Sequence, residues 1–338
     1  MSLKSALYRL LNGSRTGRAF FQARRDLRGN EAVRAVEASS YDFVDRSRGS
    51  EKLCIVLAGY KPTLWDDVFG RLAAYVPEDV DVCIMTSGLV NDELKDLAAR
   101  RGWSYLSTSV NHISFVQNLA IELHRKARWI YKIDEDMFLT EGFFEALFDT
   151  YQRVKEESLY EPAFVSPLIN VNCYGHLRIL EKLGLLDDFR ATGLTGVKFT
   201  DGIHHDRQVI EDPRVARYLW GDSCPELRDI DALSRRFRKE GFSYSVCPIR
   251  FSTGSILFTR DAWEEFGRFP ITATSDSCGL GDDEECLCRY ACFTGQAIVV
   301  CENSVVGHLG YGGAQTKAML AYHDEHPERF ALKASADV

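Results

Sequence analysis

Apolar segments of strand length alternate with segments of helical periodicity along residues 52–157. The expected strands cover residues 53–58, 82–85, 104–106 and 129–133, and the expected helices cover residues 63–76, 91–101, 113–126 and 141–157. Such alternation is typical of βαβ units, which build a doubly wound, mainly parallel sheet with helices on both faces. We therefore expect a single α/β sheet of Rossmann-like form. Ligands of such sheets bind beyond the carboxyl ends of the strands, so the residues that follow each strand are the first candidates for a site.

The remaining segments surround this core. Residues 170–245 are polar, aromatic and rich in glycine, with helical patches at 176–189 and 225–240, and we interpret them as an insertion in the main domain. Strand and helix patterns return at 255–258, 261–266, 284–293 and 297–301. We expect a helical extension over residues 1–50, a main domain over 51–312, and a C-terminal region over 313–338 that consists of a helix (314–325) and a tail.

Charge is distributed unevenly along the chain. Residues 1–50 hold ten Lys and Arg against five Asp and Glu, whereas the whole chain has a formal net charge of −8. An acidic chain of this size is not expected to bind nucleic acid. The basic segment 1–36 has two interpretations: an arm that contacts an anionic membrane surface or a partner, or a solvated helix packed on the main domain.

The sequence favours a cytoplasmic protein, peripheral to the inner face of the membrane if segment 1–36 contacts it. No stretch approaches the roughly 18 apolar residues of a membrane span. Ten cysteines at scattered positions indicate reduced thiols rather than a disulfide framework. Cys278, Cys286, Cys288 and Cys292 are close in sequence, but one helix cannot present them all to a metal ion, so we interpret them as core thiols.

The most specific candidate site is Asp134-Glu135-Asp136, directly after the expected strand 129–133. Two carboxylates at positions i and i+2 leaving a strand can converge on one Mg²⁺ or Mn²⁺ ion, which prefers oxygen ligands. Such an ion keeps open positions for phosphate oxygens of a substrate. The sequence therefore predicts a divalent-cation site at this edge of the sheet.

Two further candidates lie near the C-terminus. Asp282 and Asp283 open an expected helix, where carboxylates either complement the helix dipole or accept a proton from a hydroxyl nucleophile. His308 follows an apolar segment and is either a core histidine or an imidazole ligand of the same cation.

These residues, taken in order, resemble a GT-A glycosyltransferase, and most closely the family 2 group of inverting enzymes, over residues 52–310. The resemblance is carried by Ala58-Gly59-Tyr60, Asp134-Glu135-Asp136, the segment 253–260 with Phe266-Gly267-Arg268-Phe269, Asp282-Asp283 with Arg289, and His308. Asp282 departs from the family's Glu at that position, and the 170–245 insertion has no counterpart in the family pattern.

The resemblance implies a metal-dependent transfer of a hexosyl or N-acetylhexosaminyl group from a nucleoside-diphosphate sugar, UDP- or GDP-linked, to a hydroxyl acceptor. Residues 51–312 would then be the catalytic domain, with the insertion on its acceptor side. The implied role is bacterial-type surface glycan or polysaccharide synthesis, on a glycan or lipid-linked acceptor.

The resemblance also assigns roles to residues. Mn²⁺ or Mg²⁺ would bind Asp134, Asp136 and His308, and the base would be Asp283 or Asp282. The expected donor contacts are Ala58, Tyr60, Ser87, Asn118, Asp134 and Glu135, of which Tyr60, Ser87 and Asn118 also have structural interpretations. Two alternatives remain: a retaining transferase of the same fold, and a catalytically silent carbohydrate-binding protein.

Overall fold

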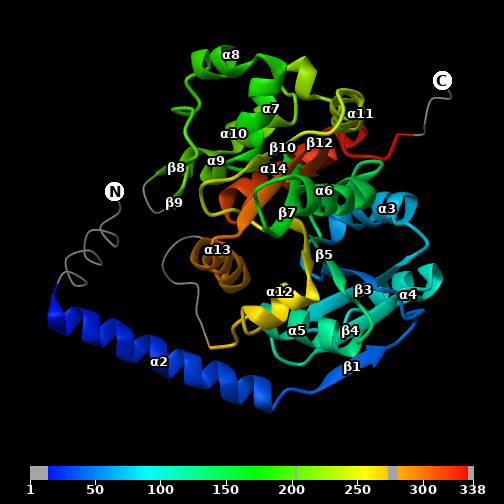
Figure 1. Cartoon of the computed structure of the whole chain (residues 1–338), viewed down its shortest axis with the longest axis vertical. Coiled ribbons are helices and arrows are strands. Elements are labelled where there is room, and N and C mark those ends of the chain that lie inside the picture. The colour runs from blue at the N-terminus through cyan, green and yellow to red at the C-terminus, as the bar shows by residue number, and fades with distance from the viewer. Residues whose placement is uncertain (1–13, 202–203, 273–280, 334–338) are drawn as a thin grey trace.

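A computed structural model describes residues 14–201, 204–272 and 281–333 (Figure 1). One half of its central sheet is parallel, with strands in the order β4-β3-β2-β5. These strands are β2 (Lys52–Leu57), β3 (Val80–Ser87), β4 (Ser104–Thr108) and β5 (Trp129–Asp134). Every residue of β3 and β4 is buried, which requires cover on both faces of the sheet, and these strands consist of apolar residues and short polar ones. The predicted α/β class with one mainly parallel sheet is confirmed.

The other half of the sheet is mixed. β11 (Ser255–Thr259) lies antiparallel between β5 and β7 (Pro162–Ile169), and β12 (Ala297–His308) runs parallel to β7. The short strands β10 (Tyr244–Val246) and β6 (Met137–Phe138) pair with β12. At the opposite edge, β1 (Tyr41–Val44) pairs with β4, so part of the segment expected to be a helical extension belongs to the sheet.

Helices connect the parallel strands as expected. They are α3 (Trp65–Tyr75), preceded by the short 3-10 helix η1 (Pro62–Leu64), α4 (Asp92–Arg101), α5 (Ile113–Leu123) and α6 (Phe143–Glu157). After β11 come α12 (Arg260–Glu265) and α13 (Asp282–Thr294), and α13 packs beside β7 and β12. The first turn of α13 is acidic, and carboxylates there are stabilised by the positive end of the helix dipole.

The insertion forms a mainly helical layer at the top of Figure 1. It contains α7 (Gly175–Leu183), α8 (Leu186–Ala191), the hairpin of β8 (Thr200–Asp201) and β9 (His204–His205), α9 (Arg207–Glu211), α10 (Pro213–Leu219), η2 (Pro225–Leu227) and α11 (Ile230–Lys239). α11 packs on β12, and α10 packs on the C-terminal helix α14 (Ala314–Glu325), which is followed by η3 (Pro327–Arg329). The insertion is thereby joined to the sheet and to the chain's last helix.

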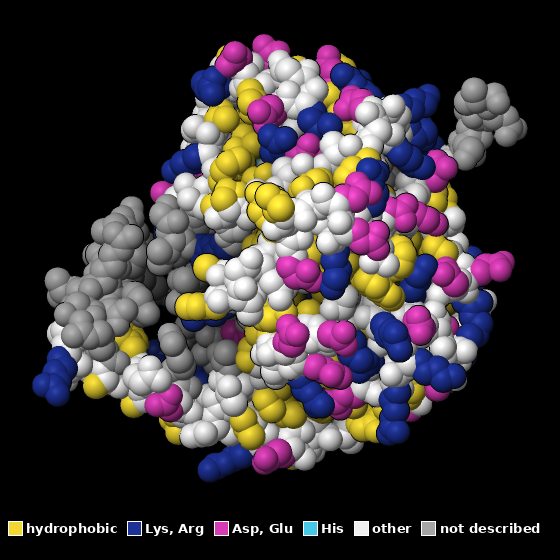
Figure 2. Space-filling model, in the orientation of Figure 1, with side chains coloured by type: hydrophobic (Ala, Val, Ile, Leu, Met, Phe, Trp, Pro, Cys, Tyr) yellow, Lys and Arg dark blue, Asp and Glu magenta, His cyan; other side chains and the backbone are white. Residues whose placement is uncertain are grey.

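The N-terminal helix α2 (Arg15–Glu37) extends along one side of the molecule in Figure 1. Phe20 and Leu27 on this helix are exposed. In the described segments, no helix is both long enough and apolar enough to cross a membrane. On the face seen in Figure 2, basic and acidic side chains are interspersed over the region of α3 and α4.

Candidate active site

A cleft of about 450 Å³ lies beyond the carboxyl ends of β2 and β5. Leu57 and Asp134, the last residues of these two neighbouring strands, are paired in the parallel register. The other lining residues come from segments 60–61, 111–113, 135–137, 252–254, 281–284 and 308–312 and from Lys132 and Ile169, although Asp282 itself does not line the cleft. The cleft therefore occupies the position at which open α/β sheets bind ligands.

The cleft brings Asp136 and His308 together, as the sequence predicted. Nε2 of His308 lies 3.6 Å from Oδ2 of Asp136, and Nδ1 lies 2.8 Å from the carbonyl oxygen of Val171. The backbone N–H of His308 donates to Oδ1 of Asn170. When Nδ1 donates to Val171, the lone pair of Nε2 is directed to the Asp136 side, which is the arrangement of a metal-ligating histidine.

Lys61 is a member of this cluster that the sequence did not indicate. Its ammonium pairs with Oδ2 of Asp136. Burial on its own would raise the pKa of Asp136, but Lys61 and His308 hold that pKa well below its usual value. Burial would lower the pKa of His308, whereas the negative charge of Asp136 raises it. Asp136 is thus a buried, ionised carboxylate.

Asp134 and Asp283 are linked by a second buried cation, Lys132. Nζ of Lys132 lies 3.1 Å from Oδ1 of Asp134 and 3.6 Å from Oδ2 of Asp283, and it donates to the carbonyl oxygen of Thr253 at 2.9 Å. The sequence did hold a signal for this residue. Lys132 is a charged residue in an otherwise apolar strand, two positions before Asp134, and residues i and i+2 of a strand share one face.

The structure separates the two candidate bases. Asp283 is buried, lines the cleft, and accepts a hydrogen bond from Nε2 of Gln117 at 3.0 Å. Asp282 opens α13 but does not line the cleft. The geometry therefore favours Asp283 over Asp282 as the group that can reach a bound substrate.

Glu284 fixes the position of α13 against the segment 252–254. One of its carboxylate oxygens accepts from the backbone N–H of Thr253 at 2.8 Å, and the other accepts from the backbone N–H of Gly281, the residue before α13, at 3.0 Å. Burial, together with the negative charge of Asp283, raises the pKa of Glu284 to about 7.

Glu135, expected to contact the donor, binds this chain's own backbone instead. Its carboxylate accepts hydrogen bonds from the backbone N–H groups of Gly59 and Tyr60 and from Nε1 of Trp65. Gly59 has a φ of 131°, which a glycine adopts without strain. Glu135 thereby holds the turn after β2 in place.

Three other expected donor contacts do not line the cleft. Ala58 is fully buried, and the Ser87 hydroxyl accepts from the backbone N–H of His112. The side chain of Asn118 is engaged by Nε1 of Trp263 and by the backbone of Phe269. Because these groups are buried in contacts of the fold, the donor contacts expected of Ala58, Ser87 and Asn118 have no geometric support.

Tyr60 keeps both of its interpretations. Its hydroxyl donates to the carbonyl oxygen of Ser87 at 2.6 Å, while the residue is 54% exposed and lines the cleft. The hydrogen bond fixes the ring at the edge of the cleft, where a planar group can stack on it.

The described cysteines of the cluster, Cys286, Cys288 and Cys292, are not assembled into a metal centre. Cys288 is buried and Cys292 is exposed, while Cys278 lies outside the described residues. Among the residues that the structure describes, no group of three His, Cys, Asp or Glu side chains is assembled to hold a metal ion. Of the three ligands expected from the sequence, Asp136 and His308 lie together, whereas Asp134 pairs with Lys132.

Comparison with known proteins shows a similarity in backbone fold only. No protein-family model matches the sequence, and no curated protein matches it. One similar solved structure is described as GalNAc-T7 with UDP, GalNAc and Mn²⁺, with a TM-score of 0.44 and 10% sequence identity. The match covers 85% of this chain and 52% of that chain, so this chain spans about half the length of the other. A likeness at this level carries no argument about activity.

Proposed function

We propose that this chain is a GT-A glycosyltransferase that transfers a sugar from a nucleoside-diphosphate sugar to a hydroxyl acceptor with the help of a divalent cation. The observation that supports this most directly is the cleft itself. It combines an Asp136–His308 pair suited to a cation with a separate buried carboxylate, Asp283, on another element. Sugar transfer from a diphosphate needs both functions: charge neutralisation at the leaving group and a base for the acceptor.

Asp136 and His308 fit the cation. A carboxylate oxygen and an imidazole nitrogen suit Mn²⁺ or Mg²⁺, with Mn²⁺ more tolerant of nitrogen. When bound, the cation supplies Lewis-acid stabilisation of the diphosphate leaving group. Lys61 then has a role of its own, since its ammonium is freed from Asp136 and can pair with a phosphate oxygen from the same side of the cleft. Tyr60 is placed to stack on the nucleotide base.

Asp283 performs the proton transfer in this proposal. The acceptor hydroxyl gives its proton to the Asp283 carboxylate while the acceptor oxygen bonds to the anomeric carbon. The bond from that carbon to the diphosphate oxygen breaks, and its electron pair leaves with the nucleoside diphosphate. Gln117 and Lys132 hold Asp283 in position. Attack opposite the leaving group inverts the anomeric carbon.

Nucleotide release tests the proposal. The full chain is incubated with UDP- and GDP-linked hexoses and N-acetylhexosamines plus Mn²⁺ or Mg²⁺, and free UDP or GDP is measured. Asp136→Asn is expected to lose release and the Mn²⁺-dependent thermal shift with UDP or GDP. Release from no donor, without any such shift in the wild type, would leave a catalytically silent carbohydrate-binding protein as the better description.

Two neighbouring acids provide a matched comparison for the base. Asp283→Asn is expected to keep donor binding and to lower transfer by about 10²- to 10⁴-fold, since a general base contributes about that much. Asp282→Asn, on the same helix end but outside the cleft lining, is expected to retain transfer. Retention of the anomeric configuration in the product would instead favour a retaining transferase in which Asp283 positions the substrate.

The wider role is also proposed from the sequence. Surface glycan or polysaccharide synthesis at the cytoplasmic face of a membrane would give segment 1–36 a function as a basic arm, of which the structure describes the part in α2. Deletion of residues 1–36 is expected to spare donor hydrolysis and to reduce sedimentation with vesicles of anionic phospholipid. Loss of hydrolysis on deletion would show that the arm supports the fold.

A further inference from the structure

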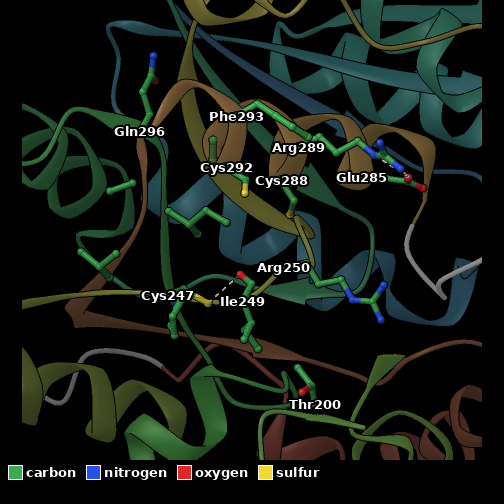
Figure 3. Close-up of a pocket in the computed structure, with 15 residues that line it drawn as sticks. Thr200, Cys247, Ile249, Arg250, Glu285, Cys288, Arg289, Cys292, Phe293 and Gln296 are labelled. Atoms are coloured by element: carbon green, nitrogen blue, oxygen red, sulfur yellow. Dashed lines mark hydrogen bonds and ion pairs between the residues drawn. The ribbon is translucent and has the colours of Figure 1, made fainter. Parts of the chain in front are cut away.

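A second cavity, of about 630 Å³, lies beside α13 on the side away from the sheet's parallel half (Figure 3). Its walls come from α13, from strand β10 with the segment 247–250 that follows it, from the start of β12, and from Thr200 in the insertion. A cavity of this volume is in the range that binds small molecules. Neither its residues nor its position belong to the cleft described above.

The lining of this cavity is mainly apolar. Cys288 and Cys292, one turn apart on α13, project from one side of the helix toward Cys247 and Ile249 in Figure 3. Phe293 also lines the cavity and is 84% exposed. An exposed aromatic ring at the rim of an apolar cavity is typical of a ligand or partner site.

One cation in this lining has no partner. Nη2 of Arg250 is buried, and among the described residues it has no hydrogen-bond acceptor and Arg250 has no ion pair with a carboxylate. The other arginine of the lining, Arg289, lies 2.6 Å from Glu285 and is already paired. A buried guanidinium nitrogen without an acceptor is costly, and an anionic ligand group would satisfy it.

The cavity and the cleft share two continuous segments. Arg250 lies two residues before Ser252, which lines the cleft, and α13 carries Asp283 in the cleft and Cys292 in the cavity. At 1.5 Å per residue of helix, Asp283 and Cys292 are separated by roughly 14 Å along α13. This separation is within the length of one elongated acceptor molecule.

We propose that this cavity binds the body of the acceptor substrate, an apolar chain or ring system with one anionic group that pairs with Arg250. The assignment to an acceptor rests on the proposed function, whereas the ligand chemistry rests on the cavity alone. The apolar walls contribute affinity through burial of the chain, and the guanidinium selects a phosphate or a carboxylate over a neutral head group.

Binding of simple amphiphiles tests the ligand chemistry without any donor. Calorimetric titration of the full chain uses dodecyl phosphate and dodecanoate, each below its critical micelle concentration, with dodecyl maltoside as the neutral probe and inorganic phosphate as the head group alone. At least one anionic amphiphile is expected to bind saturably, and the tighter of the two identifies the head group. Inorganic phosphate alone is expected to bind at least about tenfold more weakly.

Variants locate the site. Arg250→Gln is expected to weaken binding of the anionic amphiphile by about tenfold or more and to leave dodecyl maltoside unchanged. Arg236→Gln removes one exposed charge on α11 and is the control for general electrostatics. Cys292→Glu, at an exposed position, places a like charge in the cavity and is expected to weaken the same binding, so it carries the test if Arg250→Gln fails to fold.

Either of two results would overturn the proposal: no saturable binding of either anionic amphiphile to the wild type, or equal binding by the Arg250→Gln and Arg236→Gln variants. Nucleotide release is measured on the same preparations. Amphiphile binding without nucleotide release would contradict the proposed transferase activity and support the proposed ligand of the cavity. Nucleotide release without amphiphile binding would support the transferase activity and contradict the proposed ligand.

Discussion

The ammonium of Lys132 lies 3.6 Å from the carboxylate of Asp283, and both side chains are almost completely buried. Burial on its own would lower the pKa of Lys132, but the charges of Asp134 and Asp283 raise it above the usual value. Lys132 therefore stays charged at the boundary between β5 and α13. Lys132 joins Asp283, the candidate base on α13, to Asp134, the last residue of β5. The position of Asp283 relative to Asp134 therefore depends on the Lys132 side chain.

Replacing Lys132 by methionine is expected to destabilise the fold and to abolish nucleotide release. The change leaves the buried Asp283 and the half-buried Asp134 without their cation, and removal of one partner from a buried pair costs about 3–5 kcal/mol. Urea unfolding at pH 7 measures the free energy of unfolding. Lys155→Met is the control, since Lys155 pairs with Glu161 in an exposed ion pair and its loss should cost less than about 1 kcal/mol. Equal losses in the two variants would mean that Lys132 is not a structural link.

Glu284 gives a pH dependence that can be isolated by comparison of variants. Burial and the charge of Asp283 raise its pKa to about 7 in the folded chain, against about 4.3 for an unperturbed glutamate. The folded state then binds the proton more tightly than the unfolded state. The contribution of Glu284 to stability is complete below about pH 4.3 and is lost as the pH rises through about 7.

We therefore expect the Glu284→Gln variant to gain stability relative to the wild type as the pH is raised from 4.5 to 8, by about 1–3 kcal/mol. Denaturant unfolding of both proteins across this range measures the difference, in which titration of groups that do not interact with Glu284 cancels. Glu285→Gln, one residue along α13, is the control, and its difference from the wild type should not grow in the same way. A pH-independent difference for Glu284→Gln would contradict the assignment.

The main strands could be predicted because strands buried on both faces hold runs of apolar residues, as in β2 and at the centre of β3. β7 escaped prediction since it contains Pro162 and Pro167, which argue against a strand when read from sequence alone. β12 extends seven residues beyond its predicted end at Cys301. The polar residue that stopped the prediction, Glu302, is buried but paired with Arg178 at 2.7 Å, a partner more than a hundred positions away in the chain.

The candidate site could also be predicted only in part from the sequence. Asp136, Asp283 and His308 could be selected because acidic and imidazole groups after strands or at helix starts have few structural uses. Whether a polar side chain faces the cleft or the backbone is decided by its partners in space. Glu135 and Asn118 have the right chemistry for a ligand, but they satisfy backbone and indole N–H groups that no sequence pattern identifies.

The insertion depends on a buried ion pair for its attachment. Arg71 of α3 is fully buried and forms a bidentate pair with Asp231 of α11, with N–O distances of 2.8 and 2.9 Å. Its guanidinium also donates to the carbonyl oxygens of Leu139, Phe330 and Ala331. One side chain thus holds together a helix of the core, the insertion and the segment after α14.

Breaking this pair from one side is expected to cost about 3–5 kcal/mol in either Arg71→Met or Asp231→Leu, because each variant leaves one buried charge without its partner. The double variant should be less destabilised than the sum of the single changes, since no unpaired charge remains. It should not regain full stability, because the three carbonyl groups lose their donor. Denaturant unfolding of the four proteins gives the coupling energy. Additive losses would show that the two charges do not stabilise each other.

The contact between α3 and α14 is expected to weaken as the pH rises above about 6.5, the unperturbed pKa of histidine. Nε2 of His323 lies 2.7 Å from Oδ2 of Asp67, with the imidazole packed beside Phe330. Burial would lower the pKa of His323, but the hydrogen bond and charge of Asp67, supported by Asp324, raise it above its ordinary value. A raised histidine pKa stabilises the fold fully below about pH 6.5, the unperturbed value, and this contribution is lost as the pH rises through the folded-state value.

We expect the pair of His323 and Asp67 to contribute on the order of 1 kcal/mol to the free energy of unfolding, as a largely buried charged hydrogen bond does, and we expect this contribution to disappear over that interval. Asp67→Asn and His323→Gln should each flatten the same part of the stability profile, as measured by denaturant unfolding between pH 6 and 9. A profile that keeps its slope in both variants would assign the pH dependence to other groups.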